Sequence, residues 1–305
     1  MSEIYLKVDK ICKSYKDANA ITDISFKVNK GELFGFIGPD GAGKTTIFRI
    51  LATLLLPDNG KVTINGFDAV KQYKNVRQII GYMPGRFSLY HDLSVEENLN
   101  FFATIFGTSI EENYNLVKHI YSHIEPFKKR RAGKLSGGMK QKLALSCALI
   151  HKPEILILDE PTTGVDAVSR REFWEMLKNL QKMDITIVVS TPYMDEAELC
   201  DRVALIQSGK IMKIDKPKSI TTGFNKIIYS IFSDNVYKLL TDLRKYKLTE
   251  SAYPFGQQVH LILKDNNGDI QNLKEFLILN NHKEVKIKLS EPTIEDCFMD
   301  LMVTN

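Results

Sequence analysis

A phosphate-binding loop is the clearest chemical motif in this sequence. Residues 38–45 match the pattern G-x-x-x-x-G-K-[ST], and Thr46 follows. Glycines let backbone N–H groups turn inward around phosphates, and a helix beginning near Lys44 adds its positive end. We expect Lys44 to bridge the β- and γ-phosphates and Thr45 to offer a hydroxyl ligand to Mg²⁺. The predicted nucleotide-binding residues of this loop are Gly38, Pro39, Asp40, Gly41, Ala42, Gly43, Lys44, Thr45 and Thr46.

Two acids at the end of an apolar run complete this chemistry. The run Ile155–Leu158 predicts a buried strand, and Asp159 and Glu160 follow at its carboxyl end, where ligands bind in α/β sheets. A phosphate loop needs such a carboxylate on a neighbouring strand. We expect Asp159 to hold Mg²⁺ together with Thr45, and Glu160 to polarise the attacking water as general base.

A second anion-binding motif lies between the loop and the acids. Residues 135–142 read Leu-Ser-Gly-Gly-Met-Lys-Gln-Lys and open an apolar helix, so Ser136 and two glycines stand at a helix N-terminus. A chain with one nucleotide would then have two anion-binding sites, the phosphate loop and this segment. That arrangement makes sense if the second site faces the nucleotide of another subunit. This segment resembles the LSGGQ signature of ATP-binding cassette (ABC) proteins. The resemblance implies that Ser136 and Gly138 contact ATP in trans, in a head-to-tail dimer.

The resemblance extends over residues 1 to about 215. It implies that adenine stacks on Tyr15, which also fits a half-buried strand tyrosine. Residues 161–166, Pro-Thr-Thr-Gly-Val-Asp, resemble the D-loop that couples the two sites of the dimer. The segment from Tyr82 to Leu99 resembles the one that contacts the membrane subunits.

Two positions depart from the family pattern. The family has Gln where this chain has Gly85, and that Gln reaches the metal and the water. The family has His where this chain has Pro192, which has neither a side-chain donor nor a backbone N–H. We therefore expect this chain's own site to hydrolyse slowly, while Ser136 and Gly138 serve a better site on a partner cassette. This favours a heterodimer over a homodimer and leaves both open.

The elements that must position these residues are alternating strands and helices. Apolar patterns predict strands at 4–8, 24–28, 33–37, 155–158 and 185–189, and helical spacing follows the phosphate loop and recurs over 170–180. Such alternation favours a three-layer α/β domain. The resemblance implies a P-loop NTPase of the ABC type, in which a RecA-like core carries an antiparallel β subdomain and a helical subdomain.

A change of composition near Asp215 predicts two domains, residues 1–215 and 216–305. The second is expected to run strand 227–232, helix 235–244, strand 258–263, helix 270–279, strand 284–289 and a helix after Pro292. We interpret it as a small α/β appendage of the split βαβ type. Export cassettes of the ABC-2 kind often carry an appendage ending in Pro-Thr-x-Glu-Asp-x-Phe, here residues 292–298. The same residues also fit a capped amphipathic helix.

Composition and charge narrow the class of protein, although the charge does not exclude nucleic-acid binding. The chain has 305 residues, 44% hydrophobic, with a formal charge of only +4, so it has no overall basic footprint for nucleic acid. Its four scattered cysteines suggest reduced thiols in a cytosolic protein. Neither a signal peptide nor a membrane-spanning run is apparent. The basic run at residues 128–134 fits either a solvated turn or a positive rim of the nucleotide site.

These observations predict an ATP-binding and ATP-hydrolysing subunit of an ABC-2-type export transporter. We expect it to be cytoplasmic and peripheral on the inner face of the cell membrane, bound to separate permease subunits and a second cassette, with ATP and Mg²⁺ as ligands and no nucleic acid. The alternative is a regulatory cassette that binds ATP with little turnover beside a competent partner. A soluble ABC ATPase of DNA repair or translation is disfavoured by the single phosphate loop and the short spacing of the motifs.

Overall fold

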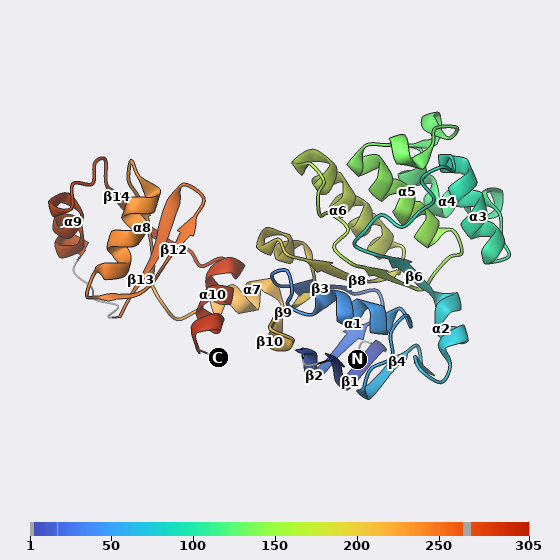
Figure 1. Cartoon of the computed structure of the whole chain (residues 1–305), viewed down its shortest axis with the longest axis horizontal. Coiled ribbons are helices and arrows are strands. Elements are labelled where there is room, and N and C mark those ends of the chain that lie inside the picture. Colours follow the sequence, from blue (N-terminus) through green and yellow to red (C-terminus); the bar gives the residue numbers. More distant parts are fainter. Residues whose placement is uncertain (1–2, 17, 265–269, 305) are drawn as a thin grey trace. The chain divides into compact units, whose positions relative to one another are not determined.

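A six-stranded sheet carries the predicted phosphate loop near its centre (Figure 1). In the computed structural model its order is β10-β9-β3-β8-β7-β6, and only β10 runs antiparallel to its neighbour. The strands are β3 (Leu33–Ile37), β6 (Ile80–Met83), β7 (Ile155–Leu158), β8 (Thr186–Thr191), β9 (Arg202–Gln207) and β10 (Lys210–Asp215). The structure describes residues 3–16, 18–264 and 270–304. The chain divides into a first unit that runs to Pro217 and a second over Lys218–Val303.

Strand β8 lies between the phosphate-loop strand and the acid-bearing strand. The expectation that β7 neighbours β3 is therefore wrong, because β8 pairs in parallel with both. All three strands are buried along their whole length, which explains their nearly continuous apolar sequence. As a result, the carboxyl end of β8 lies between the strand end that leads into the loop and the strand end that carries the acids.

A second, antiparallel sheet lies on one side of the six-stranded sheet, with α1 (Lys44–Leu51) packed between them. Its order is β2-β1-β4-β5, formed by β2 (Ala18–Asn29), β1 (Ile4–Tyr15), β4 (Asn59–Ile64) and β5 (Phe67–Asp68). Three aromatic rings join the two sheets and the helix: Phe26 of β2, Phe36 of β3 and Phe48 of α1. The ring of Phe36 lies 4.9 Å from that of Phe26 and 5.7 Å from that of Phe48. This aromatic core anchors the helix that follows the phosphate loop.

Helices cover the other face of the six-stranded sheet (Figure 1). They include α5 (Gly137–Leu149), α6 (Ala167–Lys182), α3 (Val95–Ile105) and α4 (Ile110–Tyr121), while α2 (Tyr73–Ile79) leads into β6. Short 3₁₀ turns lie at Glu125–Phe127, Ala132–Lys134 and Met194–Leu199. Ser94 and Ser109 each form a reciprocal capping box, which fixes where α3 and α4 begin. These layers confirm the predicted α/β class. Among the described residues, no helix is both long and apolar enough to cross a bilayer.

The second unit is an antiparallel sheet with helices, in the order βαββαβ. Its elements are α7 (Pro217–Thr222), β11 (Ile228–Phe232), α8 (Val236–Lys245), β12 (Thr249–Phe255), β13 (Gln258–Leu263), α9 (Ile270–Leu279), β14 (Lys286–Ser290) and α10 (Ile294–Thr304). The sheet order is β12-β13-β11-β14. The sequence analysis missed β12, because Pro254 and Glu250 weaken its strand pattern. An edge strand tolerates proline, since its outer N–H groups have no partner to lose.

The last helix begins with a capping box that also holds it to the sheet. Thr293 donates through its N–H and its hydroxyl to Asp296 Oδ2, and the Asp296 N–H donates back to Thr293 Oγ1. The other oxygen, Asp296 Oδ1, lies 2.6 Å from both Tyr253 Oη and His260 Nδ1, on β12 and β13. The Thr-x-x-Asp part of the terminal motif therefore both starts α10 and anchors it.

Candidate nucleotide-binding site

The glycines of the phosphate loop are required by close packing and by backbone conformation. A Cβ added to Gly38 would lie 2.1 Å from the carbonyl oxygen of Ile206, and the Gly38 N–H donates to the Thr191 carbonyl at 3.3 Å. Gly41 and Gly43 have φ angles of 78° and 100°, in the region that favours glycine. The loop is thus built against the ends of β8 and β9.

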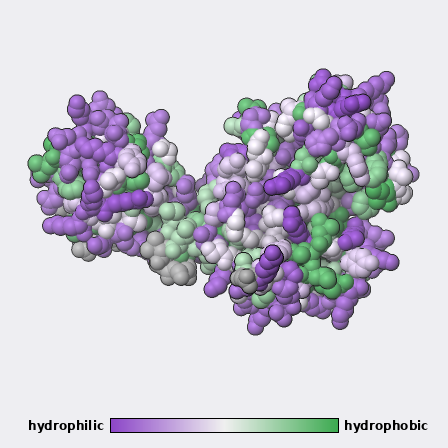
Figure 2. Space-filling view, in the orientation of Figure 1, coloured by the Kyte–Doolittle hydropathy of each residue, from purple (hydrophilic) through white to green (hydrophobic). Residues whose placement is uncertain are grey.

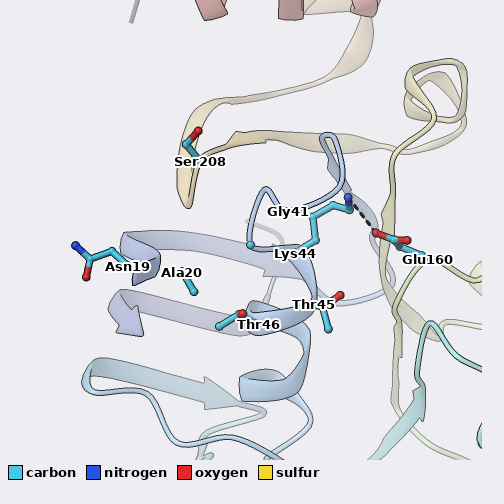
Figure 3. Close-up of a pocket in the computed structure, with 9 residues that line it drawn as sticks. Asn19, Ala20, Gly41, Lys44, Thr45, Thr46, Glu160 and Ser208 are labelled. Atoms are coloured by element: carbon cyan, nitrogen blue, oxygen red, sulfur yellow. Dashed lines mark ion pairs between the residues drawn. The ribbon is translucent and has the colours of Figure 1, made fainter. Parts of the chain in front are cut away.

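Lys44 is buried and holds the loop together. Its ammonium group donates to the carbonyl oxygens of Gly38 at 2.7 Å and Pro39 at 2.9 Å. It also forms an ion pair with Glu160, with 3.0 Å between Nζ and Oε1 (Figure 3). Only 3% of Lys44 is exposed, so its charge acts with little screening by water. A strong fixed cation therefore faces the carboxylate predicted to act as base.

A cavity of about 350 Å³ opens beside Lys44. It is lined by Gly41, Gly43, Lys44, Thr45, Thr46 and Glu160 of the predicted set, and by Asn19, Ala20 and Ser208. Figure 3 shows Asn19 and Ala20 arriving from β2 and Ser208 from the turn between β9 and β10. The sequence analysis missed these three residues, because no phosphate-binding motif marks them. A Cβ on Gly43 would lie 2.7 Å from the Ala20 carbonyl oxygen, so β2 packs directly against the loop.

Asp159 is well suited to hold a divalent cation together with Thr45. It is 2% exposed, and it accepts hydrogen bonds from the hydroxyls of Ser190 and Thr45. Burial raises the pKa of Asp159, while these two hydrogen bonds oppose that rise. The described residues contain no group of three or more His, Cys, Asp or Glu side chains that could hold a metal ion. One carboxylate and one hydroxyl fit Mg²⁺, which keeps several waters and binds substrate phosphates.

Glu160 adopts an unusual backbone conformation at the end of β7. Its φ angle is 47°, which is uncommon for a residue with a side chain. The Glu160 N–H donates to Ser190 Oγ at 2.9 Å, and the side chain points to Lys44. Thr45, Asp159 and Glu160 also line a larger groove next to the Lys44 cavity. Thr45 and Glu160 thus line both openings, and Asp159 lines the larger groove.

Three predicted residues outside the loop lie away from this cavity: Tyr15, Ser136 and Gly138. Tyr15, at the end of β1, is 45% exposed and is not among the lining residues. Ser136 caps α5 by accepting from the Met139 N–H at 3.3 Å. A Cβ on Gly138 would lie 2.6 Å from Ser169 Oγ, so this glycine lets α5 and α6 approach. Within one chain, therefore, the 136–138 segment does not meet Lys44.

The basic run lies on the helical side of the unit. Lys128 forms an ion pair with Glu96 at 3.1 Å, and the Arg130 guanidinium lies 4.5 Å from the centre of the Phe127 ring. Neither basic residue lines the Lys44 cavity. The structure therefore favours the solvated turn over the positive rim.

The larger groove has a volume of about 1380 Å³ and joins the acids to exposed apolar side chains. Leu54 and Ile105, both on its lining, are 58% and 59% exposed. Figure 2 shows hydrophobic surface in the area where Figure 1 places the end of α1 and α2. Gly85 also lines it, and a Cβ there would lie 3.2 Å from the Asp159 carbonyl oxygen and 3.7 Å from Oδ2.

A phosphate loop on a mostly parallel sheet, two acids at the end of a strand two places away and an antiparallel sheet beside them define a nucleotide-binding P-loop domain of the ABC kind. A family model described as ABC transporter matches residues 21–163. The linearmycin resistance ATP-binding protein LnrL of Bacillus subtilis is 36% identical over 303 residues, which is 97% of each chain. The chain therefore belongs to the ABC transporter family, and its first unit is an ABC ATPase domain.

Two further similarities extend this result. The probable multidrug ABC transporter ATP-binding protein YbhF of Escherichia coli is 39% identical over 293 residues, which cover 94% of this chain. The chain spans 50% of the length of YbhF. The dimeric post-hydrolysis structure of the ATP-binding cassette MJ0796, bound to ADP and Pi, superposes with a TM-score of 0.64 at 25% identity. That match covers 69% of this chain and 98% of the other.

Proposed function

We propose that this chain is the ATP-binding and ATP-hydrolysing subunit of an ABC-type exporter. The observation that carries the proposal is the buried Lys44 ammonium, which faces Glu160 at 3.0 Å beside a cavity lined by Thr45 and Thr46. The names of the relatives support an export role, since YbhF is named a probable multidrug transporter component and LnrL a linearmycin resistance protein.

The residues of the site have separate tasks in this proposal. Lys44 neutralises the β- and γ-phosphates, and the loop N–H groups around Gly41 and Gly43 bind their oxygens. Glu160 takes a proton from the water that attacks the γ-phosphorus, while the bond to the leaving oxygen of ADP breaks. Mg²⁺, when held by Thr45 and Asp159, supplies charge neutralisation at the phosphates.

The site is completed by a second cassette. Ser136 and Gly138 lie outside the chain's own Lys44 cavity, which supports a role in trans, and the MJ0796 cassette forms a dimer. The partner is a second copy or a different cassette. Gly85 and Pro192 favour a different one, since neither offers a side-chain donor to the reacting phosphate.

The apolar groove serves as the docking surface for a separate ABC-2-type permease on the cytoplasmic face of the membrane. Its exposed Leu54, Ile105 and Phe106 form part of the lining of a single groove. Exposed apolar patches of this kind mark protein–protein contacts. The same groove reaches Asp159 and Glu160, so that a docked partner would lie close to the site of ATP hydrolysis.

A regulatory cassette with little turnover is the second candidate. The observation that favours it is that Gly85, beside Asp159, has no side chain, and that Pro192 follows β8 directly. Glu160, held beside Lys44, argues for turnover.

Equilibrium binding of ATP tests the nucleotide site. Lys44→Ala should weaken ATP binding about 10–100-fold, because hydrogen bonds to a charged group contribute about 1.5–3 kcal/mol. Lys182→Ala, on an exposed lysine at the end of α6, is the matched control and should bind as the unmodified chain does. Equal affinity in Lys44→Ala and the control, with both variants folded by circular dichroism, would contradict the proposed site.

A further inference from the structure

The end of β8 brings one hydroxyl group against both acids of β7. Ser190 is fully buried, and its Oγ donates to Asp159 Oδ1 at 2.7 Å and accepts the Glu160 N–H at 2.9 Å. On the other side of β8, the Thr191 carbonyl accepts the Gly38 N–H that opens the phosphate loop. A single strand end therefore contacts the loop, the metal-binding acid and the base.

The chemistry of the three groups fixes the direction of these hydrogen bonds. A backbone N–H only donates, so Ser190 must use a lone pair toward Glu160. Its single proton is then left for Asp159 Oδ1, which as a carboxylate oxygen accepts. With Oδ1 engaged, the rotation of the Asp159 carboxylate is fixed and Oδ2 remains on the side of Gly85. An alanine at this position would leave two buried polar groups without this partner.

The same hydroxyl helps to hold the strained backbone of Glu160. At a φ angle of 47°, Glu160 occupies a conformation that persists only where the surroundings impose it. Its N–H is held by Ser190, and its carbonyl accepts the Thr163 N–H at 3.2 Å. This conformation directs the Glu160 carboxylate to Lys44.

The loop that follows Glu160 has an anchor of its own. Thr162 Oγ1 lies 2.9 Å and 3.1 Å from the two carboxylate oxygens of Glu196, and both residues are buried. Arg170 lies 3.6 Å from the same carboxylate. Loss of the Ser190 hydroxyl should therefore disturb the aim of the two acids while the loop stays in place.

We propose that Ser190 is a positioning residue of the hydrolytic site, whose one hydroxyl sets the rotation of Asp159 and the backbone of Glu160 together. This inference rests on the proposed ATPase function. It predicts two linked effects, one on the Mg²⁺ dependence of ATP binding through Asp159 and one on turnover through Glu160. A serine that only fills the core would produce neither effect.

The test compares Ser190→Ala and Ser190→Thr with Ser146→Ala in the full chain. Ser146 is also fully buried, but its hydroxyl donates to the Lys142 carbonyl of its own helix, α5, so it controls for loss of a buried serine hydroxyl. Calorimetry measures ATP affinity with Mg²⁺ and with EDTA, and steady-state assays give kcat and KM. For Ser190→Ala we expect unchanged affinity in EDTA, with the Mg²⁺-dependent gain in affinity and kcat each reduced about 10–100-fold, as for other outer partners of metal ligands. Ser190→Thr keeps the hydroxyl and should retain most of the Mg²⁺-dependent gain in affinity and most of kcat.

The outcomes separate this inference from the function on which it rests. A chain that binds no ATP before any substitution overturns the proposed function and this inference with it. If the unmodified chain binds and hydrolyses ATP while Ser190→Ala matches Ser146→Ala in kcat and Mg²⁺ dependence, Ser190 is only a core residue. Equal losses in Ser190→Thr and Ser190→Ala, with both melting near the unmodified chain, would show that the hydroxyl is not the cause.

Discussion

At the residue scale, a few side chains of the site each contact several groups at once. Lys44 contacts two loop carbonyls and Glu160, and Asp159 accepts from two hydroxyls while its main-chain N–H bonds to the Met83 carbonyl. Such shared contacts couple the phosphate loop to the acids, so a change at any of these side chains alters the others. A buried polar network whose members are satisfied in this way is rigid, so the loop and the acids are held in one arrangement.

The two departures from the family pattern lead to a prediction about rate. Gly85→Gln with Pro192→His adds donors near the reacting phosphate. The Cβ of residue 85 would lie 3.2 Å from the Asp159 carbonyl oxygen, a close contact that the exposed loop at residue 85 must relieve by a small shift. Turnover should rise, by up to about 10²–10³-fold, the effect of one donor to a transition-state oxygen. Steady-state ATP hydrolysis measures it, with each single variant beside the double. An unchanged rate in a folded double variant would show that these positions do not limit turnover.

Most of the residues that line the Lys44 cavity could be predicted from the sequence, because a phosphate loop uses contiguous residues and Glu160 follows a plainly apolar strand. Gly41, Lys44 and Glu160 line the cavity together. Asn19, Ala20 and Ser208 could not be predicted, because they reach the loop only through the packing of β2 and of the β9–β10 turn. Tyr15, assigned to adenine on the resemblance, is exposed and remains a prediction.

At the element scale, strand order determines which residues meet. Sequence periodicity predicts β3, β7 and β8 but not their order in the sheet, and placing β8 between the other two is what brings Ser190 to the acids. Strand β12 was missed for a similar reason. Its edge position, which permits Pro254, is a property of the sheet and not of the segment.

The anchor of α10 leads to a prediction about stability and pH. Burial alone would raise the pKa of Asp296, but hydrogen bonds from His260, Thr293 and Tyr253 outweigh it and lower the pKa below its usual range. A lowered pKa means stability that is present above the unfolded-state pKa of about 3.9 and is lost as pH falls through the folded value. Asp296→Asn should therefore lower the free energy of unfolding at pH 7 by about 1.5–3 kcal/mol, the value of hydrogen bonds to a charged group.

Urea unfolding at pH 7 and at about pH 3.5, below the unfolded-state pKa of an aspartate, checks this expectation. The difference in free energy of unfolding between Asp296→Asn and the unmodified chain should be smaller at the lower pH. Asp234→Asn is a useful control, because Asp234 also has a lowered pKa but its carboxylate is exposed. A gap of equal size at both pH values would mean that the charge of Asp296 does not anchor α10.

At the scale of the whole molecule, the chain contains two units with separate cores. The first core joins both sheets around α1, and the second packs α8 and α9 on the antiparallel sheet. We propose that they are independent domains divided near residue 215, as the change of composition predicts. Such a division lets the ATPase domain work while the appendage takes another role.

A chain ending at Pro217 tests this division. It should fold and bind ATP with an affinity close to that of the full chain, because the residues that line the Lys44 cavity all come from the first unit. Calorimetry and near-ultraviolet circular dichroism measure the two properties. Aggregation, or loss of ATP binding in a folded truncated chain, would mean that the second unit supports the site.

The most direct test of the account is Mg²⁺-dependent ATP hydrolysis by the purified chain at high protein concentration, beside Glu160→Gln. The substitution keeps the shape of the side chain and removes the carboxylate that faces Lys44, which we propose acts as the base. The account predicts that the chain hydrolyses ATP, that turnover is lost in Glu160→Gln, and that both bind ATP. Equal rates in the two proteins would contradict it, because any hydrolysis would then arise without Glu160.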